Sequence, residues 1–239
     1  MRNDNKLQGK TILWNGDSLC YGTRVWGNWA TRIAEWNGAW CVNYAVGGGT
    51  VTENVPFSDE DPRMRHSVCA TLEKMHKEHP SADYVVFDGG GNDSCLLGSL
   101  LEGERPARIG EIKMNDYGGE YDANTYCGAL DTLFYKATRY WTGAKIAYIV
   151  PPRMAYHIDG KNARAYYDLA LMACRKWGIP YLDLSKRSYL NSVFSWQCDP
   201  ALDVQGNIDA GSFYIDGQHL SEAGYDVTAD IIDSFLKTL

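Results

Sequence analysis

Short runs rich in β-branched and aromatic residues alternate with longer segments of helical periodicity through most of this 239-residue chain. No other feature limits the fold as strongly, because such alternation is typical of parallel strands joined by helices that cover the faces of one sheet. We expect strands at residues 11–14, 41–46, 84–88, 145–150 and 181–184. The sequence therefore predicts an α/β fold with a five-stranded, doubly wound parallel sheet.

Helical segments fit between these strands. In the first of them, Val25, Trp29 and Ile33 recur at the spacing of one helix face. Two other segments, 94–123 and 186–212, exceed the usual length of a loop, and long loops beside a site more often form lids or binding walls than passive connections. Helices are expected at 24–36, 62–78, 124–141, 162–177 and 221–236, and irregular structure at 50–61, 94–123 and 186–212.

Length and charge narrow the range of functions. A chain of this size without a Ser-, Pro- or charge-rich linker is expected to form one domain over residues 1–239. Its 23 basic and 30 acidic residues give a formal charge of −7, so it lacks the clustered basic residues that nucleic-acid phosphates require. No apolar run approaches the ~20 residues needed to cross a bilayer. We expect neither a nucleic-acid partner nor a membrane span, and the oligomeric state stays open.

The first residues contain no apolar signal-peptide core. The expected location is therefore the cytoplasm, or the cell exterior if an export signal has been removed from the chain. Seven cysteines are scattered without a C-x-x-C pair, which predicts reduced and mostly buried thiols. His76 and His79 have helical spacing, but no third ligand is near them in sequence, so a solvated surface is favoured over a metal site.

A Gly16-Asp17-Ser18-Leu19 motif follows the first expected strand. A serine on a tight strand-to-helix turn has its hydroxyl at the edge of the sheet, where a nucleophile can reach a substrate. The alternative is that Asp17 or Ser18 only caps the following helix. The motif therefore indicates Ser18 as a candidate catalytic serine.

A serine hydroxyl needs a base, and of the five histidines only His219 has a fitting partner. In the segment Asp216-Gly217-Gln218-His219, the carboxylate stands three residues before the imidazole. This spacing allows Asp216 to bind Nδ1 of the ring and leaves Nε2 free for Ser18. The segment also directly precedes the last expected helix.

Acyl transfer further requires hydrogen-bond donors for the oxyanion. Two glycine-rich segments at strand ends provide candidates: 43–50, which includes Gly47-Gly48-Gly49, and 89–93, which ends in Asn92-Asp93. Backbone N–H groups can approach a substrate closely in the first, and the Asn92 amide can donate in the second. Neither matches a nucleotide-binding glycine pattern, although both could be permissive turns alone.

Together these residues resemble the SGNH hydrolases, also called GDSL-type esterases and lipases. Four blocks of that family occur in order: G-D-S-L at 16–19, N-x-x-x-x-G-x-T at 43–50, G-x-N-D at 90–93 and D-x-x-H at 216–219. The resemblance implies a flavodoxin-like three-layer α/β/α sandwich without metal or organic cofactor. It also implies Ser18 as nucleophile, His219 as base and Asp216 as its orienter, with an oxyanion hole formed by the Ser18 N–H, the Gly48 N–H and the Asn92 side chain. Gly47 or Gly49 could replace Gly48, and the insertion after Asn92 leaves the substrate wall undefined.

The expected enzyme is a serine esterase acting on a small-molecule or carbohydrate ester through an acyl-enzyme. Short acyl groups, above all acetyl esters of carbohydrates, are favoured because aromatic residues in the expected loops could stack on sugar rings. A lipase, lysophospholipase or thioesterase of the same family is the alternative, and a catalytically silent glycan-binding module is the alternative from another class. The loop aromatic and imidazole residues in question are Tyr117, Tyr121, Tyr156, His157, Phe194 and Trp196. Cys20, Cys95, Asp17 and Asp93 are expected to pack or to cap turns.

Overall fold

The computed structural model describes residues 5–23, 25–100, 106–154, 161–194, 196–198 and 213–239. Its centre is a parallel sheet of five strands in the order β2-β1-β3-β4-β5. β1 lies between β2 and β3, so that Ile12 is paired with Cys41 on one side and with Tyr84 on the other. The strands are β1 (Thr11–Asn15), β2 (Trp40–Asn43), β3 (Tyr84–Asp88), β4 (Lys145–Val150) and β5 (Tyr181–Asp183). The predicted sheet is confirmed.

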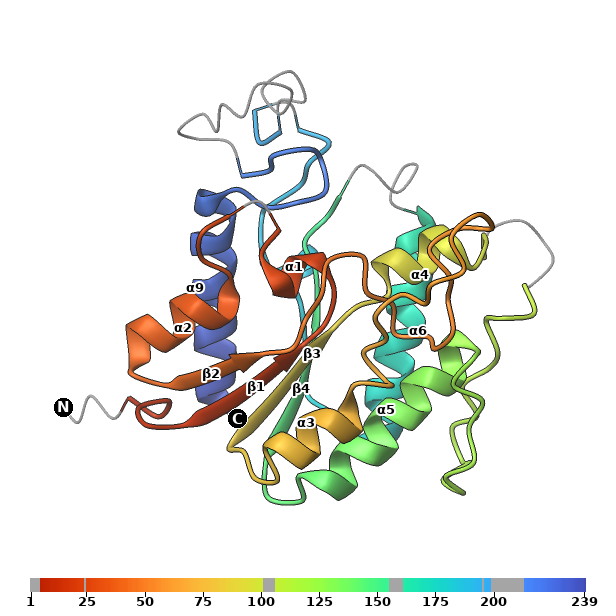
Figure 1. Cartoon of the computed structure of the whole chain (residues 1–239). Coiled ribbons are helices and arrows are strands. Elements are labelled where there is room, and N and C mark those ends of the chain that lie inside the picture. Colours follow the sequence, from red (N-terminus) through yellow and green to blue (C-terminus); the bar gives the residue numbers. More distant parts are fainter. Residues whose placement is uncertain (1–4, 24, 101–105, 155–160, 195, 199–212) are drawn as a thin grey trace.

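Helices cover both faces of this sheet, as Figure 1 shows. The helices α2 (Trp29–Asn37) and α9 (Glu222–Thr238) pack together on one face. The helices α3 (Leu72–Glu78), α5 (Tyr126–Tyr140) and α6 (Lys161–Trp177) form the layer on the other face. The expected three-layer α/β/α sandwich is therefore confirmed.

Burial of the central strands explains why their positions could be read from the sequence. All five residues of β3 are buried, and β4 is buried from its second residue onward. Strands covered on both faces consist of continuous apolar runs, which are easy to recognise. At the edge of the sheet β2 is less buried, and its first residue, Trp40, is 68% exposed.

Two expected helices begin later than predicted. The first begins at Trp29 because the Asn28 side chain caps it by accepting a hydrogen bond from the Thr31 N–H at 2.9 Å. The helix expected over 62–78 begins at Leu72, because the chain before it pairs with the loop after β2 through isolated bridges such as Thr50 to Ser67. The expectation of helix at 62–71 was wrong.

Three short helices were not expected: α1 (Ser18–Tyr21), α4 (Gly91–Leu96) and α7 (Leu184–Arg187). They follow the carboxyl ends of β1, β3 and β5. The end of α4 lies in the segment 94–123 and the end of α7 in the segment 186–212, both of which were expected to be irregular. Figure 1 places α1 and α4 at the same edge of the sheet. No helix in the described parts of the chain is long and apolar enough to span a membrane. That the chain forms one domain stays a prediction.

Candidate active site

Ser18 lies on a sharp turn at the carboxyl end of β1 and is the first residue of α1. The Asp17 side chain caps this helix by accepting a hydrogen bond from the Leu19 N–H at 3.0 Å. The Asp17 N–H in turn donates to Oδ1 of Asp88 at 2.9 Å, which holds the turn against the end of β3. The capping role expected for Asp17 is confirmed, and the turn that presents Ser18 is held on both sides by carboxylates.

Asp88 is a part of this site that the sequence analysis did not identify. Its carboxyl group is buried, and its Oδ2 has no hydrogen-bond partner among the residues that the structure describes. Burial together with the charge of Asp17 raises the pKa of Asp88 well above the ordinary value. A Cβ atom at Gly16 would lie 1.5 Å from Oδ1 of Asp88. Only glycine at position 16 allows this carboxyl group to reach the turn. An acidic residue that ends an otherwise apolar strand was the available signal.

Two further carboxyl groups surround the turn. Burial raises the pKa of Asp17 to about 6, although the Leu19 N–H and the charge of His219 act in the opposite direction. Asp93 is fully buried in α4 and accepts hydrogen bonds from the Val51 N–H and from the N–H and hydroxyl of Thr52 at 2.6–3.0 Å. Asp93 therefore does more than cap a turn, because it fixes α4 against the loop that follows β2.

The buried position of Asp17 predicts a dependence of stability on pH. The pKa of Asp17 is about 6 in the folded protein, whereas the ordinary value is 3.8. As the pH rises from about 4 to 6, this carboxyl group is therefore ionised in the unfolded state while it is still protonated in the folded state. The free energy of unfolding should therefore fall as the pH rises through this range. Asp17→Asn retains the capping oxygen but cannot ionise. We expect a flatter profile and a gain on the order of 2 kcal/mol above pH 6.

Urea unfolding at pH 4, 5, 6 and 7 measures this effect, with Asp216→Asn as the control. The folded-state pKa of Asp216 is lowered to about 2, so the stability that it contributes is present above 3.8 and is lost only as the pH falls towards 2. Asp216→Asn should thus leave the slope between pH 4 and 6 unchanged. A wild-type slope in the Asp17→Asn variant would contradict the assignment.

Asp216 and His219 form a close pair in the loop before α9. Nδ1 of His219 lies 2.7 Å from Oδ2 of Asp216, and Oδ1 accepts hydrogen bonds from the N–H groups of His219 at 2.7 Å and Gln218 at 3.1 Å. Burial would raise the pKa of Asp216, but the His219 ring and these N–H groups outweigh it and lower the pKa to about 2. Asp216 is therefore ionised at neutral pH and fixes the orientation of the ring.

α9 ties this histidine loop to the serine turn. The Tyr225 hydroxyl, buried in the first turns of α9, donates to the Leu19 carbonyl oxygen at 2.7 Å. The charge of His219 lowers the pKa of Asp17, so the imidazole lies within electrostatic reach of the residue next to Ser18. Among the described residues no hydrogen bond joins Ser18 to His219, and such catalytic contacts often tighten only when substrate binds.

The glycine-rich segments also meet at the serine turn. The Val46 N–H donates to the Gly16 carbonyl at 3.2 Å, and the Gly49 N–H donates back to Val46 at 3.0 Å in a tight turn. Gly48 has a φ of 77° in this turn, a conformation that favours glycine. One N–H of the Asn92 amide donates to the Gly49 carbonyl at 2.8 Å. The three segments thus lie in direct contact around Ser18.

Other predicted residues do not join this site. His76 stacks on Tyr140 with ring centroids 4.5 Å apart, and His79 makes an edge contact with Tyr44 at 6.1 Å. Within the described ranges no three potential ligands come together as a metal site. Five of the seven cysteines are buried, Cys20 among them, whereas Cys95 is exposed on α4.

The loop aromatic residues divide into two groups. Tyr117 and Tyr121 surround Lys176 and Trp177 at the end of α6, so they do not form a wall beside Ser18. Phe194 and Trp196 stack face to face at 4.7 Å and are 39% and 71% exposed. Their loop contacts the histidine loop, since the Ser192 hydroxyl donates to the Gly217 carbonyl at 2.6 Å and the Phe213 N–H to the Gln197 carbonyl at 2.9 Å. Tyr156 and His157 lie outside the described residues.

Residues 15–227 match the model of the GDSL-like lipase/acylhydrolase family. The chain belongs to this family. Members of the GDSL-like family hydrolyse carboxylic esters, so the chain is a carboxylic ester hydrolase, as the four sequence blocks led us to expect. A sequence search of curated proteins returned no match.

Solved structures show the same fold as this member of the GDSL-like family. A putative GDSL-like lipase from Bacteroides uniformis is 17% identical, with a TM-score of 0.62 over 96% of each chain. A carbohydrate acetylesterase family member from Sinorhizobium meliloti is 15% identical, with a TM-score of 0.59 over 96% of this chain and 98% of that chain. The aryl esterase of M. smegmatis is 15% identical, with a TM-score of 0.62 over 96% of this chain and 99% of that chain.

Proposed function

We propose that this protein is a serine esterase in which Ser18 is the nucleophile, His219 the general base and Asp216 the residue that orients His219. The observation that carries the proposal is the 2.7 Å contact between Asp216 and Nδ1 of His219, in a loop that α9 ties to the turn of Ser18. A carboxylate that holds Nδ1–H leaves Nε2 as the proton acceptor. A protein that only binds its ligand would have no use for this Asp-His pair in a loop tied to the turn of Ser18.

In this mechanism Oγ of Ser18 attacks the ester carbonyl carbon while Nε2 of His219 accepts the hydroxyl proton. The tetrahedral intermediate collapses when His219 returns the proton to the departing alcohol, which leaves an acyl-enzyme. Water, deprotonated by the same imidazole, then attacks the acyl carbon. The bond to Oγ of Ser18 breaks, the carboxylic acid leaves, and His219 returns the proton to Oγ. Asp216 remains a carboxylate throughout, in agreement with its lowered pKa of about 2.

The oxyanion would be bound by the Ser18 N–H, the Gly48 N–H and the Asn92 amide. Neither backbone N–H is donated to another group among the described residues, and one of the two amide hydrogens of Asn92 is used for Gly49. The Gly49 N–H is already bonded within its turn, which favours Gly48 over Gly49. The contacts from Val46 to Gly16 and from Asn92 to Gly49 supply the rigidity that such a donor set requires.

We further propose that the substrates are short-chain esters, above all acetyl esters of carbohydrates. The stacked and exposed Phe194 and Trp196, beside the histidine loop, support a subsite for a polar alcohol with flat faces. One structural neighbour is a carbohydrate acetylesterase family member and another is an aryl esterase, so an aryl alcohol is the alternative occupant proposed for this subsite. A lipase would need an extended acyl-binding wall instead.

An acyl-length series of chromogenic esters tests this specificity. We expect kcat/KM for acetate esters to exceed that for octanoate esters by at least about tenfold, since each misplaced methylene in a tight pocket reduces binding by on the order of 1 kcal/mol. A comparison of kcat/KM for acetylated oligosaccharides and for phenyl acetate distinguishes the two proposed alcohols. Higher values for the oligosaccharides support a carbohydrate esterase, and higher values for phenyl acetate support an aryl esterase. Faster hydrolysis of the longer esters would support the lipase alternative, and no hydrolysis of any ester would support a silent binding module.

A further inference from the structure

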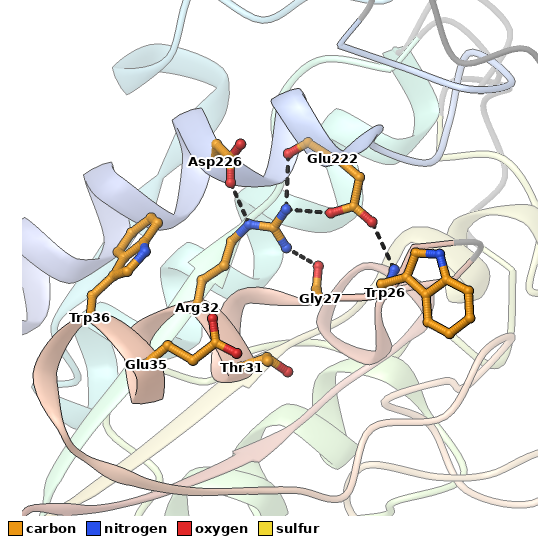
Figure 2. A pocket seen from close by; sticks show the side chains of 8 residues that line it. All are labelled: Trp26, Gly27, Thr31, Arg32, Glu35, Trp36, Glu222 and Asp226. Atoms are coloured by element: carbon orange, nitrogen blue, oxygen red, sulfur yellow. Dashed lines mark hydrogen bonds and ion pairs between the residues drawn. The ribbon is translucent and has the colours of Figure 1, made fainter.

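A pocket of about 310 Å³ lies between α2, the beginning of α9 and the chain that leads into α2 (Figure 2). This volume is at the lower end of the range for small-molecule sites. The pocket is separate from the residues proposed for ester hydrolysis, and none of the four sequence blocks contributes to its lining. Its side chains combine two chemistries, indole rings and carboxylates.

Two tryptophans form the rims of the pocket. Trp26 is completely exposed and Trp36 is 47% exposed. Figure 2 shows them on opposite sides of Arg32, with their rings apart from each other. Trp is a residue that is highly buried on average, so a fully exposed indole at the rim of a pocket suggests a platform for a ligand. Such platforms bind flat molecules through their apolar faces.

Arg32 forms the base of the pocket, and most of its guanidinium N–H groups donate to other groups of the protein. Its side chain is only 9% exposed. It donates to Oδ1 of Asp226 at 2.7 Å, to Oε2 of Glu222 at 2.5 Å and to the carbonyl oxygens of Gly27 and Glu222. Because its guanidinium is occupied in this way, Arg32 fixes two carboxylates in place and has little capacity left for an anionic ligand.

The groups that face a ligand are therefore mainly hydrogen-bond acceptors. The side chain of Asp226 is 63% exposed, and Glu35 projects into the same space. Three carboxylates against one guanidinium give the pocket a net negative charge, which disfavours anions. A purely apolar ligand would desolvate these carboxylates without giving them donors. A sugar ring has apolar faces for the indoles and hydroxyl donors for the carboxylates.

We propose that this pocket binds a neutral saccharide unit. It lies close to the candidate active site along the chain, because Glu222 is the third residue after His219 and accepts a hydrogen bond from the Trp26 N–H at 2.7 Å. This inference rests on the proposed function: the bound saccharide is a sugar unit of the same carbohydrate molecule whose ester group is hydrolysed at Ser18. The pocket would then retain a carbohydrate chain at the end of α9 that follows the histidine loop, and it would favour oligomeric over small substrates.

Binding can be tested without ester hydrolysis. Native gels containing xylan, glucomannan or hydroxyethyl cellulose would show retarded migration of the wild-type protein in at least one of these neutral polysaccharides, and calorimetry with the matching oligosaccharide would give the affinity. Trp26→Ala and Trp36→Ala should each raise the dissociation constant about fivefold or more, and the double variant should abolish retardation. The Trp26 N–H that binds Glu222 belongs to the backbone, so Trp26→Ala retains this contact.

Trp40→Ala is the matched control, since Trp40 is 68% exposed on β2 but does not line the pocket. It should bind as the wild type does, and polygalacturonate, an anionic polymer, should cause no retardation. Absence of binding to every neutral polysaccharide, or equal binding by the Trp26→Ala/Trp36→Ala variant, would overturn the proposal. An inactive esterase that still binds through these tryptophans would refute the proposed function alone.

Discussion

Ser18→Ala is expected to reduce hydrolysis of every ester substrate by at least about 10⁴-fold, because the acyl-enzyme can no longer form. The fold should remain intact, since the Ser18 hydroxyl makes no hydrogen bond among the described residues. Turnover of phenyl acetate and the midpoint of thermal unfolding measure the two effects. An active-site-directed fluorophosphonate should label the wild-type protein at Ser18 and leave the variant unlabelled.

Ser58→Ala provides the control for this experiment. Ser58 is exposed in the loop after β2, where its hydroxyl accepts a hydrogen bond from the Asp61 N–H at 3.0 Å, and no catalytic role is proposed for it. Its activity and labelling should equal those of the wild type. Wild-type turnover by Ser18→Ala, or labelling at another serine, would refute the assignment of the nucleophile.

The second large effect is expected from Gly16→Ala, although position 16 carries no reactive group. The added Cβ would lie 1.5 Å from Oδ1 and 2.6 Å from Cγ of Asp88, and 3.0 Å from Cβ of Cys20. The turn, the Asp88 carboxyl group or both must move, which would displace Ser18. We expect a loss of about 10²-fold or more in kcat and a decrease of about 1–3 kcal/mol in the free energy of unfolding, as for other overpacked sites.

Gly143→Ala is the corresponding control, because nothing lies within 4 Å of a Cβ atom at that position. Its activity and stability should stay close to those of the wild type. Adding Asp88→Ala to Gly16→Ala removes the clashing carboxyl group and should restore part of the lost stability. A fully active and stable Gly16→Ala protein would mean that the turn does not depend on this close approach.

Strands that are buried on both faces could be predicted from the sequence. The buried strands β3 and β4 have the predicted bounds, because burial on both faces leaves a continuous apolar run. Helix boundaries were less accurate where side chains or distant chain segments decide them. The start of α2 depends on the cap at Asn28, and the chain before α3 pairs with the loop that contains Thr50.

The same distinction applies to the candidate site. Asp216 and His219 could be paired from sequence because three residues separate them and local geometry is sufficient to join them. The hydrogen bond between Asp88 and the Asp17 N–H could not be predicted, because 71 positions separate the two residues and only the order of the strands brings them together. For the same reason the sequence did not reveal the pocket around Arg32, whose ion pairs reach α9, 190 positions away.

The hydrogen bond from Tyr225 to Leu19 joins residues that are 206 positions apart. The proposed nucleophile is therefore synthesised before the proposed base and before the helix that ties the two together. A nascent chain that ends before α9 contains the serine turn but not its base. Hydrolysis would then require that α9 has docked, and the appearance of turnover during refolding would report this docking step.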